Sequence, residues 1–257
     1  MDLTRAKTYG RHALRLLGLL AVVGGVVVLG VLGWQWQATV TVDRVAVTGT
    51  HYAPADTVRH LARVDSGTVM ETIDEALIAD RVERHPWVRS ARVTKQRLQG
   101  VLRIGITERV PAALALGPGN RPAYYLAPSG HAMPLPDSTG LDVPLVRGLQ
   151  ADYHPVQPVA PPMLRTVMGA LGPTDTNALV AELAVQPDST VRLITPPLAA
   201  QGPMTVQLGE GRIRTKLRRL RAFAEQVLAA RPERSIDEID LRFEGQVVTR
   251  TTTTDES

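Results

Sequence analysis

The feature that most constrains this chain is an apolar run near its N-terminus, LLGLLAVVGGVVVLGVLGW at residues 16–34, with no charged residue from Leu16 to Val42. Nineteen helical residues, at a rise of 1.5 Å each, cover roughly 28 Å, close to the hydrocarbon thickness of a bilayer. Backbone polar groups in lipid must be satisfied within the segment, so the run should be helical despite its five glycines. We therefore expect a single transmembrane helix over residues 16–36.

The charges that flank this run predict its orientation. The preceding basic residues, against the single acid Asp2, are Arg5, Lys7, Arg11 and Arg15. Positive residues stay in the cytoplasm, so we expect residues 1–15 to be a cytoplasmic basic tail and residues 37–257 to lie outside the cytoplasm. The alternative is a cleaved signal peptide, which would have a shorter core followed by small residues. Here the run ends at Trp34 and Trp36, which favours an anchor in the cytoplasmic (inner) membrane.

Composition narrows the possible functions of the rest. Hydrophobic residues make up 44% of the 257 residues, enough for a packed core. Cysteine is absent, which excludes disulfides, thiol catalysis and cysteine-bound metal. The net charge is only +4, and much of the excess lies at the N-terminus and in one helix near residue 215, so it is weak support for nucleic-acid binding.

Residues 41–109 predict a small α+β domain of order β-α-α-β-β. A strand over 42–47 ends at Gly49, and Pro54 opens a helix that includes Val58 and Leu61. A second helix, ended by Pro86, has its apolar side at Ile73, Leu77 and Val82. Two strands follow, joined at Leu98-Gln99-Gly100, with apolar positions at Val88, Ala91, Val93, Leu102, Ile104 and Ile106. We expect Trp87 to be a core residue and Glu108 with Arg109 to be a strand-end ion pair or solvated charges.

Residues 110–250 predict a second, mixed α/β domain with a mainly antiparallel sheet. The expected strands lie at 124–126, 143–146, 190–194 and 204–208, and a helix at 162–171. Residues 179–185 either continue this helix or begin a strand. The four prolines of residues 151–162 predict an extended loop, and we expect residues 196–203 to be an exposed loop. Residues 251–257 are polar and are expected to be a disordered tail.

The sequence of residues 212–231 predicts the clearest amphipathic helix of the chain. Its apolar stripe consists of Ile213, Leu217, Leu220, Phe223 and Val227. Its dense basic face consists of Arg212, Arg214, Lys216, Arg218, Arg219 and Arg221. Such a face is either simply solvated or contacts anionic lipid headgroups or an acidic partner.

The first domain resembles a POTRA domain, and more narrowly that of the FtsQ/DivIB family of bacterial cell-division proteins. The resemblance is carried by the strand that ends at Gly49, the helix pair, His85-Pro86-Trp87-Val88 and the segment Glu108-Arg109-Val110-Pro111-Ala112. It continues in the second domain at Val143-Pro144-Leu145-Val146-Arg147-Gly148 and at Asp240-Leu241-Arg242-Phe243. The chain departs from the family at the hairpin, which has no proline, and at Phe243, where the family has tyrosine. By this resemblance the chain would be a non-enzymatic scaffold that binds the division proteins FtsB and FtsL and localises to the division septum.

In the family, a partner adds a strand to the terminal sheet edge, and the resemblance places that edge at the C-terminal segment. We expect a strand leading from Ile236 to Leu241 and a second at 246–248. Unpaired N–H and C=O groups on an exposed edge can be satisfied by a second chain. The candidate partner-binding residues are Leu241, Arg242, Phe243, Glu244, Gly245, Gln246, Val247 and Val248.

Catalytic motifs do not emerge from the sequence. None of the six histidines has an obvious metal-ligand spacing with another, and phosphate-cradling and nucleophile-elbow motifs are absent. We therefore expect no enzyme activity, cofactor, metal, small-molecule substrate or nucleic-acid partner. One alternative is another POTRA-containing envelope protein that acts in polypeptide transport or outer-membrane assembly, although such proteins usually carry several POTRA repeats and a barrel. The other is a membrane-bound enzyme or sensor of the cell envelope.

Overall fold

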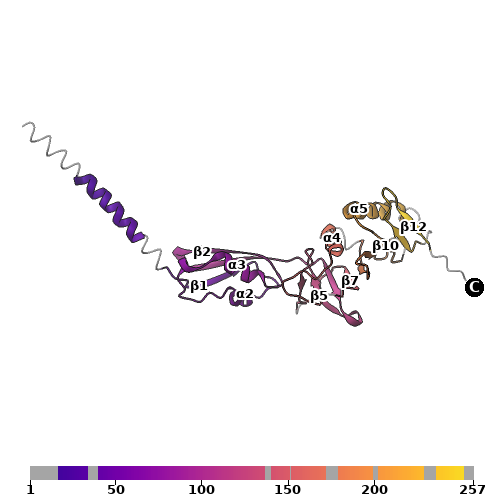
Figure 1. The fold of residues 1–257 in the computed structure, drawn as a ribbon, viewed down its shortest axis with the longest axis horizontal. Helices are drawn as coiled ribbons and strands as arrows, with labels where there is room; N and C mark the ends of the chain where they lie inside the picture. The colour runs from indigo at the N-terminus through magenta and orange to yellow at the C-terminus, as the bar shows by residue number, and fades with distance from the viewer. Residues whose placement is uncertain are drawn as a thin grey trace, which may run out of the picture. The chain divides into compact units, whose positions relative to one another are not determined.

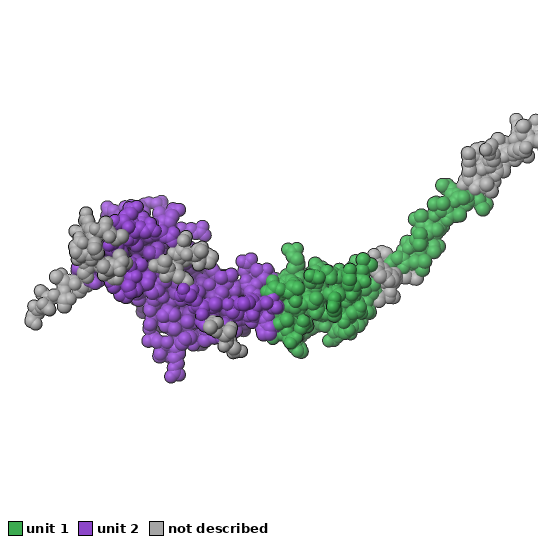
Figure 2. Space-filling model, turned by 180° about the vertical axis from the view of Figure 1, so that it is seen from behind, with its two compact units in different colours: residues 1–49, 55–82, 91–106 green, residues 50–54, 83–90, 107–257 purple. Residues whose placement is uncertain are grey.

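The computed structural model describes residues 17–33, 40–136, 140–150, 152–171, 179–198, 202–228 and 236–251. The expected cytoplasmic tail at 1–15, Trp34 and Trp36, and almost all of the C-terminal tail lie outside these ranges. The chain divides into two compact units, coloured separately in Figure 2. Unit 1 comprises residues 1–49, 55–82 and 91–106, and unit 2 comprises residues 50–54, 83–90 and 107–257. The division into domains at 41–109 and 110–250 stays a prediction.

The apolar N-terminal run is helical over residues 17–33, drawn in indigo in Figure 1. Its large side chains are exposed, for example Leu17 at 71% and Leu29 at 70%. Among the residues that the structure describes, no helix is both long enough and apolar enough to cross a membrane.

Unit 1 contains most of a three-stranded sheet with strand order β1-β3-β2. The strands are β1 (Arg44–Thr48), β2 (Val88–Gln96) and β3 (Val101–Glu108), and β1 runs parallel to β3 with Val45 opposite Leu102. The helices are α2 (Ala55–Ala62) and α3 (Glu75–Glu83), with a short 3-10 turn, η1 (Met70–Thr72), between them. The predicted order β-α-α-β-β is confirmed.

The core of this region comes from the apolar periodicity of the sequence. Leu102 and Ile104 of β3 are fully buried, as are Val58 of α2 and Val82 of α3. The link between β2 and β3 is a 3-10 turn, η2 (Arg97–Gln99), followed by Gly100 in the left-handed region at φ 62°. Glycine occupies that conformation without steric cost, so Leu98-Gln99-Gly100 makes the predicted turn without the proline of the family.

Unit 2 is organised around a nine-stranded sheet with order β12-β11-β10-β9-β8-β7-β4-β5-β6. Its strands are β4 (Ala113–Leu116), β5 (Pro122–Leu126), β6 (Ala132–Met133), β7 (Leu145–Arg147), β8 (Glu182–Val185), β9 (Val191–Ile194), β10 (Thr205–Gln207), β11 (Glu238–Asp240) and β12 (Val248–Arg250). Five of the eight neighbouring pairs among these strands are antiparallel and three are parallel. The predicted mixed domain with a mainly antiparallel sheet is confirmed, and residues 182–185 form a strand rather than more helix.

The helices of unit 2 supply the other half of its core. These are α4 (Pro162–Ala170) and α5 (Ile213–Phe223), and α5 continues as a π-helical turn, η4 (Ala224–Leu228). Buried side chains of both helices join those of the central strands in one cluster, whose largest members are Leu164, Met168, Leu183, Leu193, Met204, Leu208 and Leu220. The predicted apolar stripe of α5 is confirmed at Ile213, Leu217 and Leu220, which are buried.

Candidate functional site

The candidate partner site lies where the nine-stranded sheet ends at β12 (Figure 1). Strand β11 is not at the edge, since it pairs in parallel with β10 and antiparallel with β12. Among the residues that the structure describes, β12 pairs with β11 alone and is the last strand of the sheet. The backbone groups of β12 that point away from β11 are therefore the groups that an added strand would meet.

The register of β11 shows which backbone groups of β12 these are. Thr205 N donates to Asp237 O at 2.9 Å, and Leu241 N donates to Gln207 O at 2.9 Å, so Ile239 between them faces β10, while Asp237 N donates to Arg250 O of β12 at 3.1 Å. The backbone groups of Glu238 and Asp240 then face β12, opposite Arg250 and Val248. Because residues of an antiparallel ladder alternate in direction, the N–H and C=O of Thr249, between those two partners, point away from β11.

The predicted strand boundaries at this edge were wrong. Strand β11 ends at Asp240 and β12 begins at Val248. Seven of the eight candidate residues, 241–247, therefore form the connection between the strands, and Val248 alone lies in the edge strand. Their role in partner binding stays a prediction, now centred on the connection and on β12.

Strand β11 ends at Asp240, whose side chain bonds to the backbone two residues further on. The carboxylate of Asp240 accepts a hydrogen bond from the backbone N–H of Arg242 at 3.0 Å, which turns the chain out of the strand. The guanidinium of Arg242 donates two further hydrogen bonds to the same carboxylate, from Nε to Oδ1 at 3.0 Å and from Nη2 to Oδ2 at 2.7 Å. These bonds to Arg242 hold the pKa of Asp240 below its usual value, against the effect of burial. The chain completes its turn at Gly245, whose φ of 77° suits glycine.

The connection offers both buried and exposed side chains. Leu241 is fully buried and Val247 packs partly against the core, so these two anchor the connection. Phe243 is 52% exposed, a large apolar side chain available to a partner. Residues 242–246 are all exposed, and Val248 is half-buried.

Helix α5 contributes residues that the sequence prediction did not assign to the site. Arg212 forms an ion pair with Glu244, and Arg219 Nη1 donates to Phe243 O at 3.3 Å. The sequence predicted both arginines as a basic face but held no signal that the face adjoins the 241–247 connection. Thr249 and Arg250 were also missed, although the β-branched run from Val247 to Thr249 could have extended the strand.

Lys216 does not lie on the exposed basic face, which corrects that prediction. It is 8% exposed, and its Nζ donates to Leu208 O at 2.7 Å and Glu210 O at 2.6 Å. Both carbonyls belong to the turn before α5, so the ammonium fastens that turn to the helix. Burial, and then the neighbouring Arg219, lower the pKa of Lys216.

Glu108 was expected to pair with Arg109 or to be solvated, and it does neither. Its carboxylate accepts hydrogen bonds from three successive backbone N–H groups, those of His51 at 2.8 Å, Tyr52 at 2.9 Å and Ala53 at 2.8 Å. The loop so fixed carries Tyr52, whose ring stacks on that of Trp87 with centroids 4.4 Å apart. Trp87 is 3% exposed, which confirms its prediction as a core residue.

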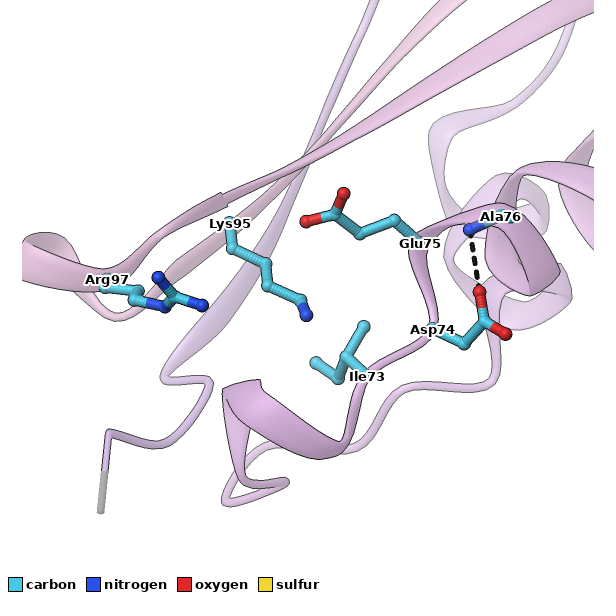
Figure 3. A pocket seen from close by; sticks show the side chains of 6 residues that line it. All are labelled: Ile73, Asp74, Glu75, Ala76, Lys95 and Arg97. Atoms are coloured by element: carbon cyan, nitrogen blue, oxygen red, sulfur yellow. Dashed lines mark hydrogen bonds between the residues drawn. The ribbon is translucent and has the colours of Figure 1, made fainter. Parts of the chain in front are cut away.

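Unit 1 has a hollow of about 450 Å³ beside the start of α3 (Figure 3). Lys95 of β2 and Arg97 of η2 lie across from Glu75, whereas the side chain of Asp74 points away from them, toward Ala76. Asp74 Oδ1 accepts from the N–H groups of Ala76 and Leu77 at 3.0 and 3.1 Å, so this carboxylate caps the helix. Two acids and two bases balance among the lining residues, which gives the hollow no net charge to attract an ion.

Within the ranges that the structure describes, no group of three or more histidine, aspartate or glutamate side chains is placed to hold a metal ion. The candidate functional site is the edge formed by β12 and the 241–247 connection.

Two family models and several curated relatives match this chain. Residues 40–109 match the family model described as POTRA domain, FtsQ-type, and residues 118–250 match FtsQ/DivIB, C-terminal related. The cell division protein FtsQ of Salinibacter ruber is 56% identical over 254 residues, which are 98% of each chain. The FtsQ of Rhodothermus marinus is 40% identical over 96% of this chain and 90% of its own, and that of Myxococcus fulvus 30% identical over 83% and 75%. By these matches the chain belongs to the FtsQ/DivIB family of bacterial cell-division proteins.

Proposed function

We propose that the chain is a non-enzymatic, single-pass membrane scaffold of the division apparatus that binds FtsB and FtsL outside the cytoplasm. It would link early and late division proteins and help to regulate septal peptidoglycan synthesis. The partner would add a strand to β12, with the 241–247 connection supplying side-chain contacts.

The observation that carries this proposal is the edge position of β12 with the outward N–H and C=O of Thr249. A partner strand at this edge forms main-chain hydrogen bonds, which give affinity without requiring a particular side chain. Phe243, more than half exposed, supplies apolar area beside the edge. Large aromatic side chains of this kind often dominate binding energy.

The membrane part of the proposal rests on sequence. The run at 16–34 is free of charge and the basic residues Arg5, Lys7, Arg11 and Arg15 precede it. A helix with these flanks is retained in the inner membrane with its N-terminus in the cytoplasm. The family and the names of its relatives support the division septum as the site of action.

The edge is tested by coexpressing the full chain with FtsB and measuring complex formation after solubilisation in detergent. Thr249→Pro removes the outward N–H of the edge strand but no bond of the ladder to β11, so the fold tolerates it. Thr249→Val keeps that N–H and serves as the matched control. We expect Thr249→Pro to weaken binding at least about tenfold and Thr249→Val to leave it unchanged.

Side-chain contacts are tested separately with Phe243→Asp and Val247→Asp, which place a charge at the connection. We expect both to abolish the complex. Retained binding in Phe243→Asp and Thr249→Pro would reject this edge as the site. In dividing cells, a fluorescent fusion of the full chain should form a midcell band, whereas uniform envelope signal would reject the divisome role.

A further inference from the structure

The turn between β2 and β3 carries the most exposed large apolar side chain among the residues that the structure describes. This is Leu98, which is 80% exposed, compared with 71% for Leu17 of the N-terminal helix. Leu98 lies in the middle of η2, and the chain turns at Gly100, so the turn does not depend on packing of the leucine. Single apolar residues on a surface are common, and the place of this one in the fold decides whether it has a role.

Parallel strand pairing puts this turn at the end of unit 1 where the chain enters it. Because β1 and β3 are parallel, the first residues of both strands lie at the same end of the sheet. Gly100, directly before β3, accepts a hydrogen bond at its carbonyl from Asp43 N at 2.7 Å, directly before β1. Val40, the first residue described after the N-terminal helix, lies three residues further back along the chain. We call residues 40–43 and 97–100 the entrance end of unit 1.

The length of chain before the entrance end keeps it close to the proposed membrane helix. That helix is described to residue 33, and six residues, 34–39, separate it from Val40. Seven residue steps span at most about 25 Å even when the chain is fully extended. With the helix in the bilayer, the entrance end therefore stays within about this distance of the extracytoplasmic face of the membrane. So short a tether keeps the local concentration of membrane surface high, and one leucine side chain is then enough to bias the orientation of unit 1.

Charged residues around Leu98 limit how deeply this end can enter a bilayer. Arg97 Nη2 lies 2.9 Å from Glu71 Oε2, and both side chains are partly exposed. Asp43 and Arg44 are neighbours in the chain and are exposed as well. Bases and acids thus lie side by side, so no single sign of charge dominates and the contact does not depend on anionic lipid. These charges remain at the level of the headgroups, where only the leucine side chain reaches the acyl chains.

We propose that Leu98 inserts into the extracytoplasmic leaflet of the membrane and holds the entrance end of unit 1 against the bilayer. This inference rests on the proposed membrane anchor and goes beyond it, since it gives the folded part of the chain a membrane contact of its own. A lipid surface is the chosen partner because the short segment 34–39 keeps such a surface near the turn at all times. A membrane segment of another protein is the alternative, and the experiment separates the two.

The absence of cysteine from the chain makes a depth measurement direct, since one introduced cysteine carries the only nitroxide label. The full chain is placed in phosphatidylcholine nanodiscs and labelled at Gln99→Cys, beside Leu98, or at Thr48→Cys, an exposed site at the far end of β1. Collisions with oxygen, which concentrates in lipid, are compared with collisions with a nickel chelate, which stays in water. We expect the label at 99 to be immersed in lipid and the label at 48 to be in water. Both labels in water would overturn the proposal.

The role of the leucine itself is tested with the label kept at residue 99. We expect Leu98→Asp to lower the ratio of immersed to aqueous label at least about tenfold, because it replaces the apolar group that the bilayer buries. Leu98→Met keeps an apolar side chain of similar size and should hold the ratio within about twofold. Equal ratios in the two variants would show that Leu98 does not make the contact.

A third label, at Val26→Cys in the apolar run, tests the anchor separately from the turn. If the label at 26 is immersed while the label at 99 is in water, the anchor stands and the contact of Leu98 with lipid is wrong. If the label at 26 is itself in water, the proposed anchor fails and this inference falls with it. If the label at 99 is in water in lipid alone but is shielded from both oxygen and nickel when FtsB and FtsL are added, the turn contacts protein rather than lipid, which overturns the proposal.

Discussion

The guanidinium of Arg242 holds the carboxylate of Asp240 through two atoms, with Nε 3.0 Å from Oδ1 and Nη2 2.7 Å from Oδ2, while Asp240 is 1% exposed. The acid is two residues upstream of its partner, so the contact both ends β11 and orients the connection to β12. Because Arg242 is itself about half exposed, the ion pair is partly screened, and its guanidinium covers the otherwise buried carboxylate.

Removing that arginine should destabilise unit 2. We expect Arg242→Gln to lower the free energy of unfolding measurably, since it leaves the carboxylate of Asp240 with one backbone donor. The measurement is urea unfolding of the full chain followed by circular dichroism. Arg250→Gln, which removes a more exposed ion pair with Glu238 at 3.5 Å, is the control and should change stability by less than about 0.5 kcal/mol. Equal losses in the two variants would contradict the account.

The same pair predicts a pH dependence. The pKa of Asp240 is lowered in the folded state, so the folded state favours the ionised acid. Its contribution is present above the pKa of the unfolded chain, near 3.9, and is lost as pH falls through the lower folded-state pKa. Unfolding free energy should therefore drop more steeply below about pH 4 in the unchanged chain than in Asp240→Asn. Parallel pH profiles of the two proteins would show that Asp240 is not the group responsible.

Glu108 should matter for the 51–53 loop. Glu108→Ala leaves three N–H groups without their acceptor and should cost about 2 kcal/mol of stability. Glu108→Gln keeps one acceptor oxygen and should cost less than Glu108→Ala. Hydrogen exchange of the Tyr52 and Ala53 amides is the direct measurement, and both should exchange faster in Glu108→Ala. Unchanged exchange in that variant would refute the role assigned to this carboxylate.

The sequence predicted those elements whose apolar spacing is regular. Leu102, Ile104 and Ile106 alternate in β3, and Ile213, Leu217 and Leu220 repeat at helical spacing in α5, and all are buried as expected. Strand β4 was not predicted, because its sequence, ALAL, has alanine at the buried positions and low strand propensity. It is a strand because β5 and β7 pair with it on its two sides, and such long-range pairing cannot be predicted from the periodicity of the sequence.

In the candidate site, too, some features could be predicted from the sequence and others depend on contacts that the sequence does not reveal. The sequence predicted that residues 241–248 lie at the sheet edge, but it did not predict where the strands end. Strand β11 ends at Asp240 because its carboxylate accepts a hydrogen bond from the Arg242 N–H. Apolar spacing alone favoured continuing the strand through Leu241, which is buried like a strand residue. Lys216 was misplaced for a related reason: its helical position suggested the exposed face, whereas the preceding turn folds over its ammonium.

The measurement that tests the central claim most directly is hydrogen exchange at Thr249 in the full chain, with and without FtsB. The account predicts that the Thr249 amide exchanges rapidly in the free chain, because its N–H points away from β11, and slows at least about tenfold when FtsB is bound, because an added strand accepts it. If FtsB binds and slows exchange elsewhere while Thr249 is unchanged, the partner does not extend this sheet, and the edge of β12 is not its site.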